Sequence, residues 1–197
     1  MYGDGIRAGE SAVLGAHSMG HQGLSWKCDW EVEKKWIGDD PLTGRRAGHV
    51  ERERFAGNLL LNGGASVMWV RLKTRNPSTS STGAATQAYS TGNARIGVGN
   101  STATAAVTQT DLQGASKKYN SMSAGYPSHT DGTSSSGARQ IQFRALYTTA
   151  QANFAWNEWG IFNSTGANKR MLNRKVQALG TKTSAAQWTF TATLSLS

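Results

Sequence analysis

The end of this chain alternates strictly between apolar and hydroxyl side chains. Every second position is apolar, and Thr or Ser fills each position between them. Successive side chains of a β-strand point to opposite faces, so this pattern predicts a strand with one buried face. Shorter alternating runs cover residues 141–147 and 154–159. We therefore expect a mainly β protein: an antiparallel β-sandwich or jelly-roll-like body with one or two short helices and an extended N-terminal arm. The apolar positions of the last run are Trp188, Phe190, Ala192, Leu194 and Leu196.

Composition agrees with one core plus appendages. The chain has 197 residues, of which 38% are hydrophobic, and it contains seven Trp, which is enough for one sizeable core. Charged residues make up only 17% and there are 23 Gly, a balance typical of β proteins with long polar loops.

Two segments precede the predicted body. Residues 1–25 are rich in Gly and show no hydrophobic period, which predicts an arm that orders only in an assembly. Trp26, Trp30 and Trp36 follow among balanced charges, and we expect these aromatics to dock on the body or on a neighbouring subunit. The predicted division is 1–50 for the arm and docking segment and 51–197 for the sandwich body.

Local patterns predict four further elements. Residues 51–61 are helix formers followed by Asn-Gly-Gly, which predicts a short helix. Residues 65–72 are mostly apolar and predict a buried strand. Residues 94–99 predict a short strand, and residues 110–118 predict one or two helical turns.

Charge is concentrated in the predicted body. Residues 55–197 contain thirteen Lys and Arg against three acids, and the whole chain has a net charge of +9. This imbalance favours anionic partners such as nucleic acid, anionic surface glycans or an acidic neighbouring subunit. Because no run of Lys or Arg exceeds two residues, we expect no specific nucleic-acid recognition.

Several site classes are not supported. The single cysteine, Cys28, excludes an intramolecular disulfide and argues against a Cys-rich zinc site. His17 and His21 have the spacing of two metal ligands on a helix, but the glycines around them make a helix improbable, so we expect no metal or cofactor. The first residues lack a signal-peptide pattern and no apolar run could span a membrane, so we expect synthesis in a cytoplasm.

Catalysis is not predicted either. A glycosidase needs two carboxylates a few ångströms apart, and residues 55–197 contain only Asp111, Asp131 and Glu158. Strict alternation would place Trp156 with Glu158 on one face and Trp159 on the other, so no single aromatic platform follows. The G-x-G in residues 95–101 lacks the Lys-Ser/Thr of a phosphate loop and is better explained as a strand and turn. We expect a protein that is not an enzyme.

The carboxylate of Glu158 is instead predicted to be structural. Four aromatic residues surround it in the sequence, and a buried carboxylate needs a basic partner and backbone N–H groups. A hairpin through residues 163–168 would bring Arg174 beside it, so we predict a Glu158–Arg174 ion pair that fixes strand register.

Five motifs in residues 51–197 resemble structural proteins of tailed bacteriophages, namely tail, collar and fibre-associated components with β-rich bodies. In that group an Asp usually follows the G-V-G turn, whereas this chain has Asn100. The motifs are Gly57-Asn-Leu-Leu-Leu-Asn-Gly-Gly64, Ala94-Arg-Ile-Gly-Val-Gly-Asn-Ser101, Gln109-Thr-Asp-Leu-Gln-Gly114, Ala152-Asn-Phe-Ala-Trp-Asn-Glu-Trp-Gly-Ile-Phe162 and Leu172-Asn-Arg174.

The resemblance implies a bacteriophage virion structural protein, with a homo-oligomeric tail, collar or head-to-tail component as the first expectation. The alternatives are a capsid decoration protein and, from a different class, a receptor- or polysaccharide-binding module. Expected partners are other copies of the chain and neighbouring tail, portal or capsid proteins, with anionic host-surface glycans as a further candidate. The expected location is the virion, after synthesis in the host cytoplasm.

Overall fold

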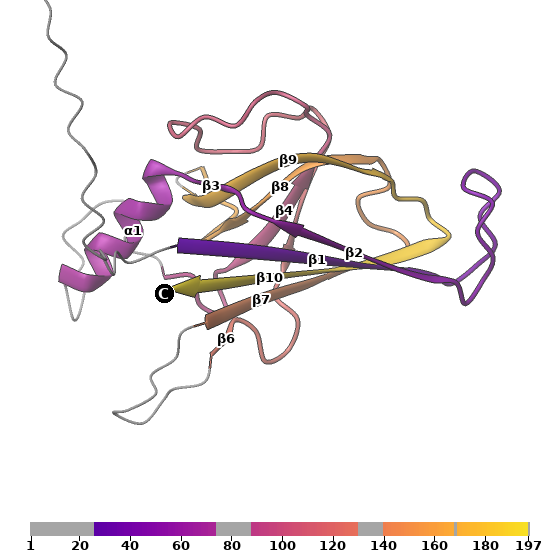
Figure 1. Ribbon diagram of the computed structural model, residues 1–197, viewed down its shortest axis with the longest axis horizontal. Helices are drawn as coiled ribbons and strands as arrows, with labels where there is room; N and C mark the ends of the chain where they lie inside the picture. Colours follow the sequence, from indigo (N-terminus) through magenta and orange to yellow (C-terminus); the bar gives the residue numbers. More distant parts are fainter. Residues whose placement is uncertain (1–25, 74–87, 130–139, 168, 197) are drawn as a thin grey trace, which may run out of the picture.

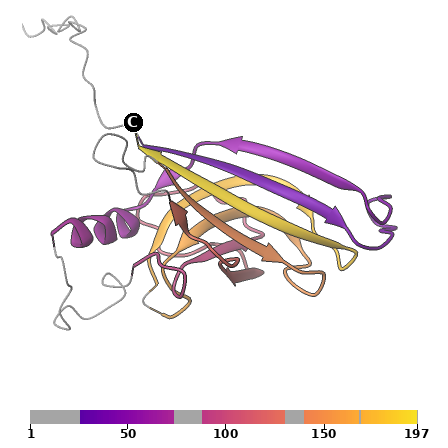
Figure 2. The same ribbon diagram turned by 90° about the horizontal axis from the view of Figure 1, so that it is seen from below.

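The chain forms two five-stranded antiparallel sheets that pack face to face, as the sequence predicts (Figures 1 and 2). The computed structural model describes residues 26–73, 88–129, 140–167 and 169–196. One helix, α1 (Asn62–Lys73), lies at one end of the sandwich. Sheet A has the strand order β2 (Val50–Ala56), β1 (Trp26–Trp36), β10 (Ala186–Leu196), β7 (Gln140–Tyr147) and β6 (Ser128–His129). Sheet B has the order β3 (Leu59–Leu60), β9 (Met171–Thr181), β8 (Ala155–Phe162), β4 (Arg95–Gly99) and β5 (Lys117–Ser121).

The main core lies between the sheets and is dominated by tryptophan. Aromatic rings meet mostly edge to face, the arrangement that their quadrupoles favour. The ring centroids of Trp30 and Phe190 are 5.3 Å apart, and those of Trp156 and Trp188 are 4.7 Å apart. Trp159 lies 5.3 Å from the same Phe190 ring. Strand β10, which contains the alternating run, therefore supplies the apolar surface on which the aromatic residues of both sheets pack.

The segment that the sequence sets apart from the body at residues 50 and 51 contributes a strand to a sheet of the body. Strand β1 is a central strand of sheet A, paired with β2 on one side and with β10 on the other. Trp30 and Trp36 are 1% and 4% exposed, and Trp26 packs against the same core. These tryptophans therefore pack on the chain's own body. Residues 1–25, the predicted arm, lie outside the described residues.

The helix predicted over residues 51–61 is wrong, because this segment contains β2 and β3. The alternating charges of β2 find partners across the sheet: Arg52 pairs with Glu33 and Arg54 with Glu31. Such cross-strand ion pairs support a strand through residues distant in the sequence, which local helix propensity does not register.

The strand predicted over residues 65–72 is also wrong, because the segment belongs to α1. A Cβ on Gly64 would lie 2.5 Å from the backbone of Leu172, so only glycine allows the helix to start this close to β9. The helical turns predicted over residues 110–118 are absent as well: residues 110–116 are irregular, and Lys117 begins β5. The strands predicted over residues 94–99, 141–147 and 154–159 are confirmed as β4, β7 and β8.

Candidate functional site

The outer face of sheet B is covered by the long connection between β4 and β5, residues 100–116, which we call the cover loop. It contains no helix or strand, yet it is held closely against the sheet. Leu112 of the cover loop joins Leu61, Phe162 and Met171 in a second, smaller buried cluster on this face. The face away from the main core is thus also a packed layer.

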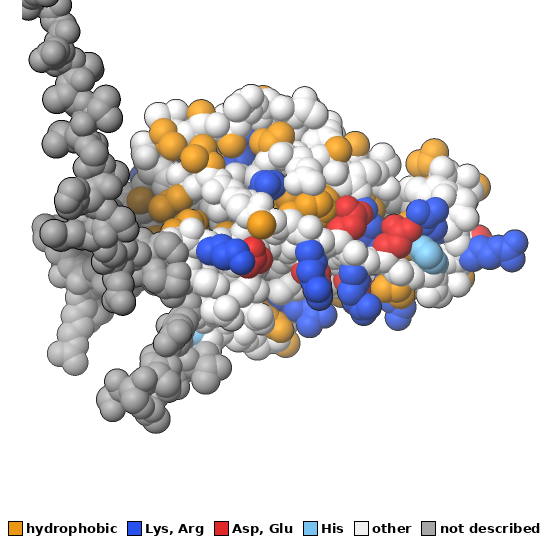
Figure 3. All heavy atoms as spheres, in the orientation of Figure 1, with side chains coloured by type: hydrophobic (Ala, Val, Ile, Leu, Met, Phe, Trp, Pro, Cys, Tyr) orange, Lys and Arg blue, Asp and Glu red, His pale blue; other side chains and the backbone are white. Residues whose placement is uncertain are grey.

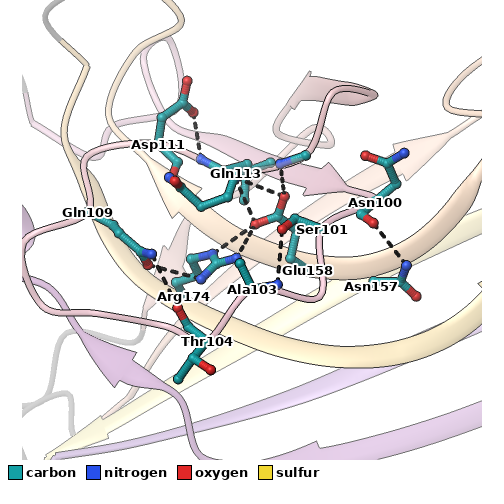
Figure 4. A network of polar contacts seen from close by, with 12 residues as sticks. Asn100, Ser101, Ala103, Thr104, Gln109, Asp111, Gln113, Asn157, Glu158 and Arg174 are labelled. Carbon is teal, nitrogen blue, oxygen red and sulfur yellow. Dashed lines mark hydrogen bonds and ion pairs between the residues drawn. The ribbon is translucent and has the colours of Figure 1, made fainter.

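Glu158 lies under the cover loop and is completely buried (Figure 4). Arg174 donates from Nε to Glu158 Oε2 at 2.8 Å, and its Nη2 lies 2.7 Å from the same oxygen. The backbone N–H of Gln113 donates to both carboxylate oxygens at 3.0 Å, and that of Gly114 donates to Oε1 at 2.6 Å. A Cβ on Gly99 would lie 2.5 Å from Oε1, so glycine leaves the space that the carboxylate occupies. The residues expected to pair are therefore in contact, and the carboxylate joins β8, β9 and the cover loop.

Strict alternation fails at β8, and the failure positions Glu158. The pairing of β8 with β9 shifts register between Trp156 and Glu158, which marks a β-bulge. As a result Trp156 and Trp159 both enter the main core, whereas Glu158 faces the cover loop. The expectation that Trp156 shares a face with Glu158 is wrong, since the irregular pairing with β9 at this point interrupts the alternation of β8.

Arg174 also holds the cover loop through Gln109. Its Nη1 donates to Gln109 Oε1 at 2.9 Å, and the same oxygen accepts the backbone N–H of Ala106 at 2.9 Å. Gln109 Nε2 donates to the carbonyl of Thr104 at 3.2 Å (Figure 4). Arg174 therefore links the buried carboxylate to the outermost part of the loop.

Asn100 anchors the start of the cover loop. Its Oδ1 accepts the backbone N–H of Ser116 at 3.1 Å, and its carbonyl accepts Asn157 Nδ2 at 3.0 Å. A Cβ on Gly114 would lie 2.4 Å from Asn100 Oδ1, so the loop closes on itself at a glycine. An amide oxygen thus makes the turn contact at the position where the resemblance to bacteriophage proteins leads us to expect an Asp.

A second carboxylate at this site, that of Asp111 in the cover loop, lies among basic groups. It accepts a hydrogen bond from Tyr119 Oη, and its Oδ2 lies 2.9 Å from Lys169 Nζ and 3.5 Å from Lys117 Nζ. Burial works to raise the pKa of Asp111, but the hydrogen bonds of Tyr119 and Lys169 and the charge of Lys169 outweigh it and lower that pKa. Asp111 thereby fixes the loop to β5 as an ionised acceptor.

The other candidates from the sequence lie apart from this cluster. Cys28 is buried in the main core, and desolvation raises its pKa to about 12, so it remains a packed thiol. His49 is exposed and pairs with Glu51. His17, His21 and Asp131 lie outside the described residues. Within the described ranges, no group of three or more His, Cys, Asp or Glu could hold a metal ion.

Sequence reasoning missed three buried charged residues: Lys34, Asp40 and Lys182. Lys34 had a visible signal, because it falls at an inward position of β1 between Val32 and Trp36. Its Nζ donates to the carbonyl of Leu179 at 2.6 Å, pairs with Glu53, and lies 4.6 Å from the centroid of the Trp188 ring. Lys34 thus joins β2 of sheet A to β9 of sheet B.

The five motifs that carry the bacteriophage resemblance meet in this region. Three supply Glu158, its partner Arg174 and the backbone donors of residues 109–114; the other two supply Gly99 with Asn100, and β3, which pairs with β9 at Arg174. Comparison of the chain with protein-family models, curated proteins and solved structures finds no match. Among the described residues, no helix has the length and apolar character to cross a membrane.

Proposed function

We propose that this chain is a non-enzymatic structural protein of a bacteriophage virion, acting as a homo-oligomeric tail, collar or head-to-tail component. The observation that carries the proposal is the convergence of the five phage-like motifs on one buried clamp. Their side chains and glycines shape and secure the cover loop. A repeated subunit benefits from such a rigid surface, because binding then requires little ordering.

The state of Glu158 favours a structural role over catalysis. A general acid or base must exchange a proton with a substrate, which requires a reachable oxygen. Both oxygens of Glu158 accept hydrogen bonds from the chain itself, and the side chain is fully buried. The proposal therefore assigns Glu158 to folding.

Immunogold electron microscopy tests the location. An antibody against the purified chain is applied to particles released from cells that carry the gene. We expect gold at the tail or neck of the particle. Label spread over the head would instead support capsid decoration, and unlabelled particles from a lysate that contains the chain would overturn the proposal.

A thermal-shift measurement tests the receptor- or polysaccharide-binding alternative. A ligand that binds only the folded state raises the melting temperature. We expect no shift with glycans from the host surface for an assembly subunit. A saturable, concentration-dependent increase would favour the binding module.

A further inference from the structure

The connection between β1 and β2, residues 37–49, forms a rigid projection that we call the hairpin tip. Asp40 is buried within it and organises it. Its carboxylate accepts the N–H of Leu42 at 3.1 Å, the hydroxyls of Thr43 at 2.8 Å and Thr183 at 2.7 Å, and Trp36 Nε1 at 3.2 Å. Burial opposes ionisation of Asp40, but these hydrogen bonds outweigh it and lower its pKa to about 2. The tip is thus preorganised at neutral pH.

The hairpin tip and its base expose an unusual share of large apolar side chains. Ile37, Leu42 and Val50 are 49%, 71% and 40% exposed, and they are three of the five exposed large hydrophobic residues in the described part of the chain. The tip lies at one end of the long axis of the molecule, with hydrophobic atoms at its surface (Figures 1 and 3). Exposed apolar groups on a rigid projection are typical of a protein-docking element.

The tip carries an arginine that is free to pair. Asp39 accepts the N–H of Ala47, and Arg45 pairs with Glu51 at the start of β2. Within the described part of the chain, Lys35 and Arg46 make no ion pair. A complementary surface therefore needs an apolar depression with carboxylates beside it.

Such a depression lies on the outer face of sheet A, toward the other end of β1 and β2; we call it the sheet A hollow. It has a volume of about 500 Å³. The strand register explains it. The row Ala56–Asp29–Thr193 consists of short side chains, and it lies beside the row Arg54–Glu31–Thr191, which contains two long ones. The side chains of Asp29 and Glu31 are 41% and 34% exposed, and they pair only with well-exposed cations, Lys27 and Arg54. Exposed pairs of this kind are weak and can accept another cation.

We propose that the hairpin tip of one copy inserts Leu42 into the sheet A hollow of a neighbouring copy, with Arg46 beside the carboxylates of Asp29 and Glu31. This inference rests on the homo-oligomer of the proposed function and names its contact. The hairpin tip and the sheet A hollow lie at different ends of β1 and β2, so one copy can use both at once. Such head-to-tail contacts build rings or filaments.

Two substitutions separate the two halves of the contact. Leu42→Asp places a charge at the apex, and Ala56→Arg fills the hollow and repels Arg46. Both positions are exposed, so the fold should be retained, which circular dichroism and a thermal melt check. Val107→Asp is the matched control, because Val107 is also an exposed hydrophobic residue, 44% exposed, but lies on the cover loop.

Sedimentation velocity of the full chain provides the test. We expect the parent and Val107→Asp to form species larger than dimers as concentration rises. Leu42→Asp and Ala56→Arg should each associate at least about tenfold more weakly. An equimolar mixture of Leu42→Asp and Ala56→Arg should form a dimer and stop there, because each supplies one intact half.

Three results would overturn the inference: a parent that stops at a dimer or stays monomeric, variants that associate as the parent does, or a mixture that remains monomeric. Association of both variants at parental strength leaves the virion assignment intact, since that assignment depends on particle labelling. Unlabelled particles would remove the virion assignment even where the head-to-tail contact holds.

Discussion

Glu158 is the residue whose replacement should affect stability most directly. Glu158→Gln leaves the guanidinium of Arg174 buried without its counter-charge, and breaking a buried pair in this way typically costs about 3–5 kcal/mol. Urea unfolding should show this loss. Adding Arg174→Met removes the stranded charge and should recover part of it. A Glu158→Gln protein with the parental unfolding midpoint would contradict the structural role of the carboxylate.

Lys182 should make stability depend on pH in the alkaline range. Its Nζ is buried, hydrogen bonds to Asn153 Oδ1 at 2.8 Å, and has a pKa lowered to about 8 by desolvation. The unfolded chain keeps this proton until about pH 10. Between these values the unfolded state binds more protons, so the free energy of unfolding rises with pH, at most by about 1 kcal/mol per unit.

The measurement is the difference in unfolding free energy between the parent and Lys182→Met at pH 7 and pH 9. The comparison removes the opposing effect of Cys28, whose raised pKa makes the folded state lose stability once the unfolded thiol ionises. We expect the parent to gain relative to the variant as pH rises. An unchanged difference would mean that Lys182 is solvated when folded.

Among the elements, the cover loop depends on close backbone approach at Gly114. A Cβ there would lie 2.4 Å from Asn100 Oδ1 and 2.7 Å from its backbone nitrogen. Gly114→Ala should therefore displace the loop and cost about 1–3 kcal/mol, as overpacking commonly does. Hydrogen exchange should accelerate in residues 100–116. Gly92→Ala is the control, because a Cβ there meets nothing within 4 Å.

Strands in which apolar and polar side chains alternate could be predicted from the sequence, whereas elements supported by distant partners could not. Strand β10 has an uninterrupted period because its register with β1 and β7 is regular throughout. Strand β2 instead depends on ion pairs with Glu31 and Glu33, which lie about twenty residues earlier. The Glu158–Arg174 pair could be predicted from one hairpin. The backbone donors of residues 113 and 114 could not be predicted, because the cover loop approaches Glu158 only in the folded structure.

At the scale of the whole molecule, the two sheets depend on each other through β1. Its side chains Trp30, Val32 and Trp36 are in the main core, and Lys34 reaches the carbonyl of Leu179 in sheet B. Its outward side also supplies part of the sheet A hollow, while its end leads into the hairpin tip. Strand β1 therefore contributes to the main core, to the link between the two sheets and to the proposed contact.

A chain truncated to residues 51–197 should consequently fail to fold. It lacks β1, so β10 and β2 lose their shared partner and the core loses two buried tryptophans. Replacing a single buried tryptophan by Ala commonly costs about 3–5 kcal/mol, and domains are stable by only about 5–15 kcal/mol. Circular dichroism and urea unfolding should show no cooperative transition. A chain of residues 26–197 retains every described strand pair and should unfold cooperatively. Cooperative unfolding of residues 51–197 would support the boundary predicted from the sequence and would mean that the core forms without β1.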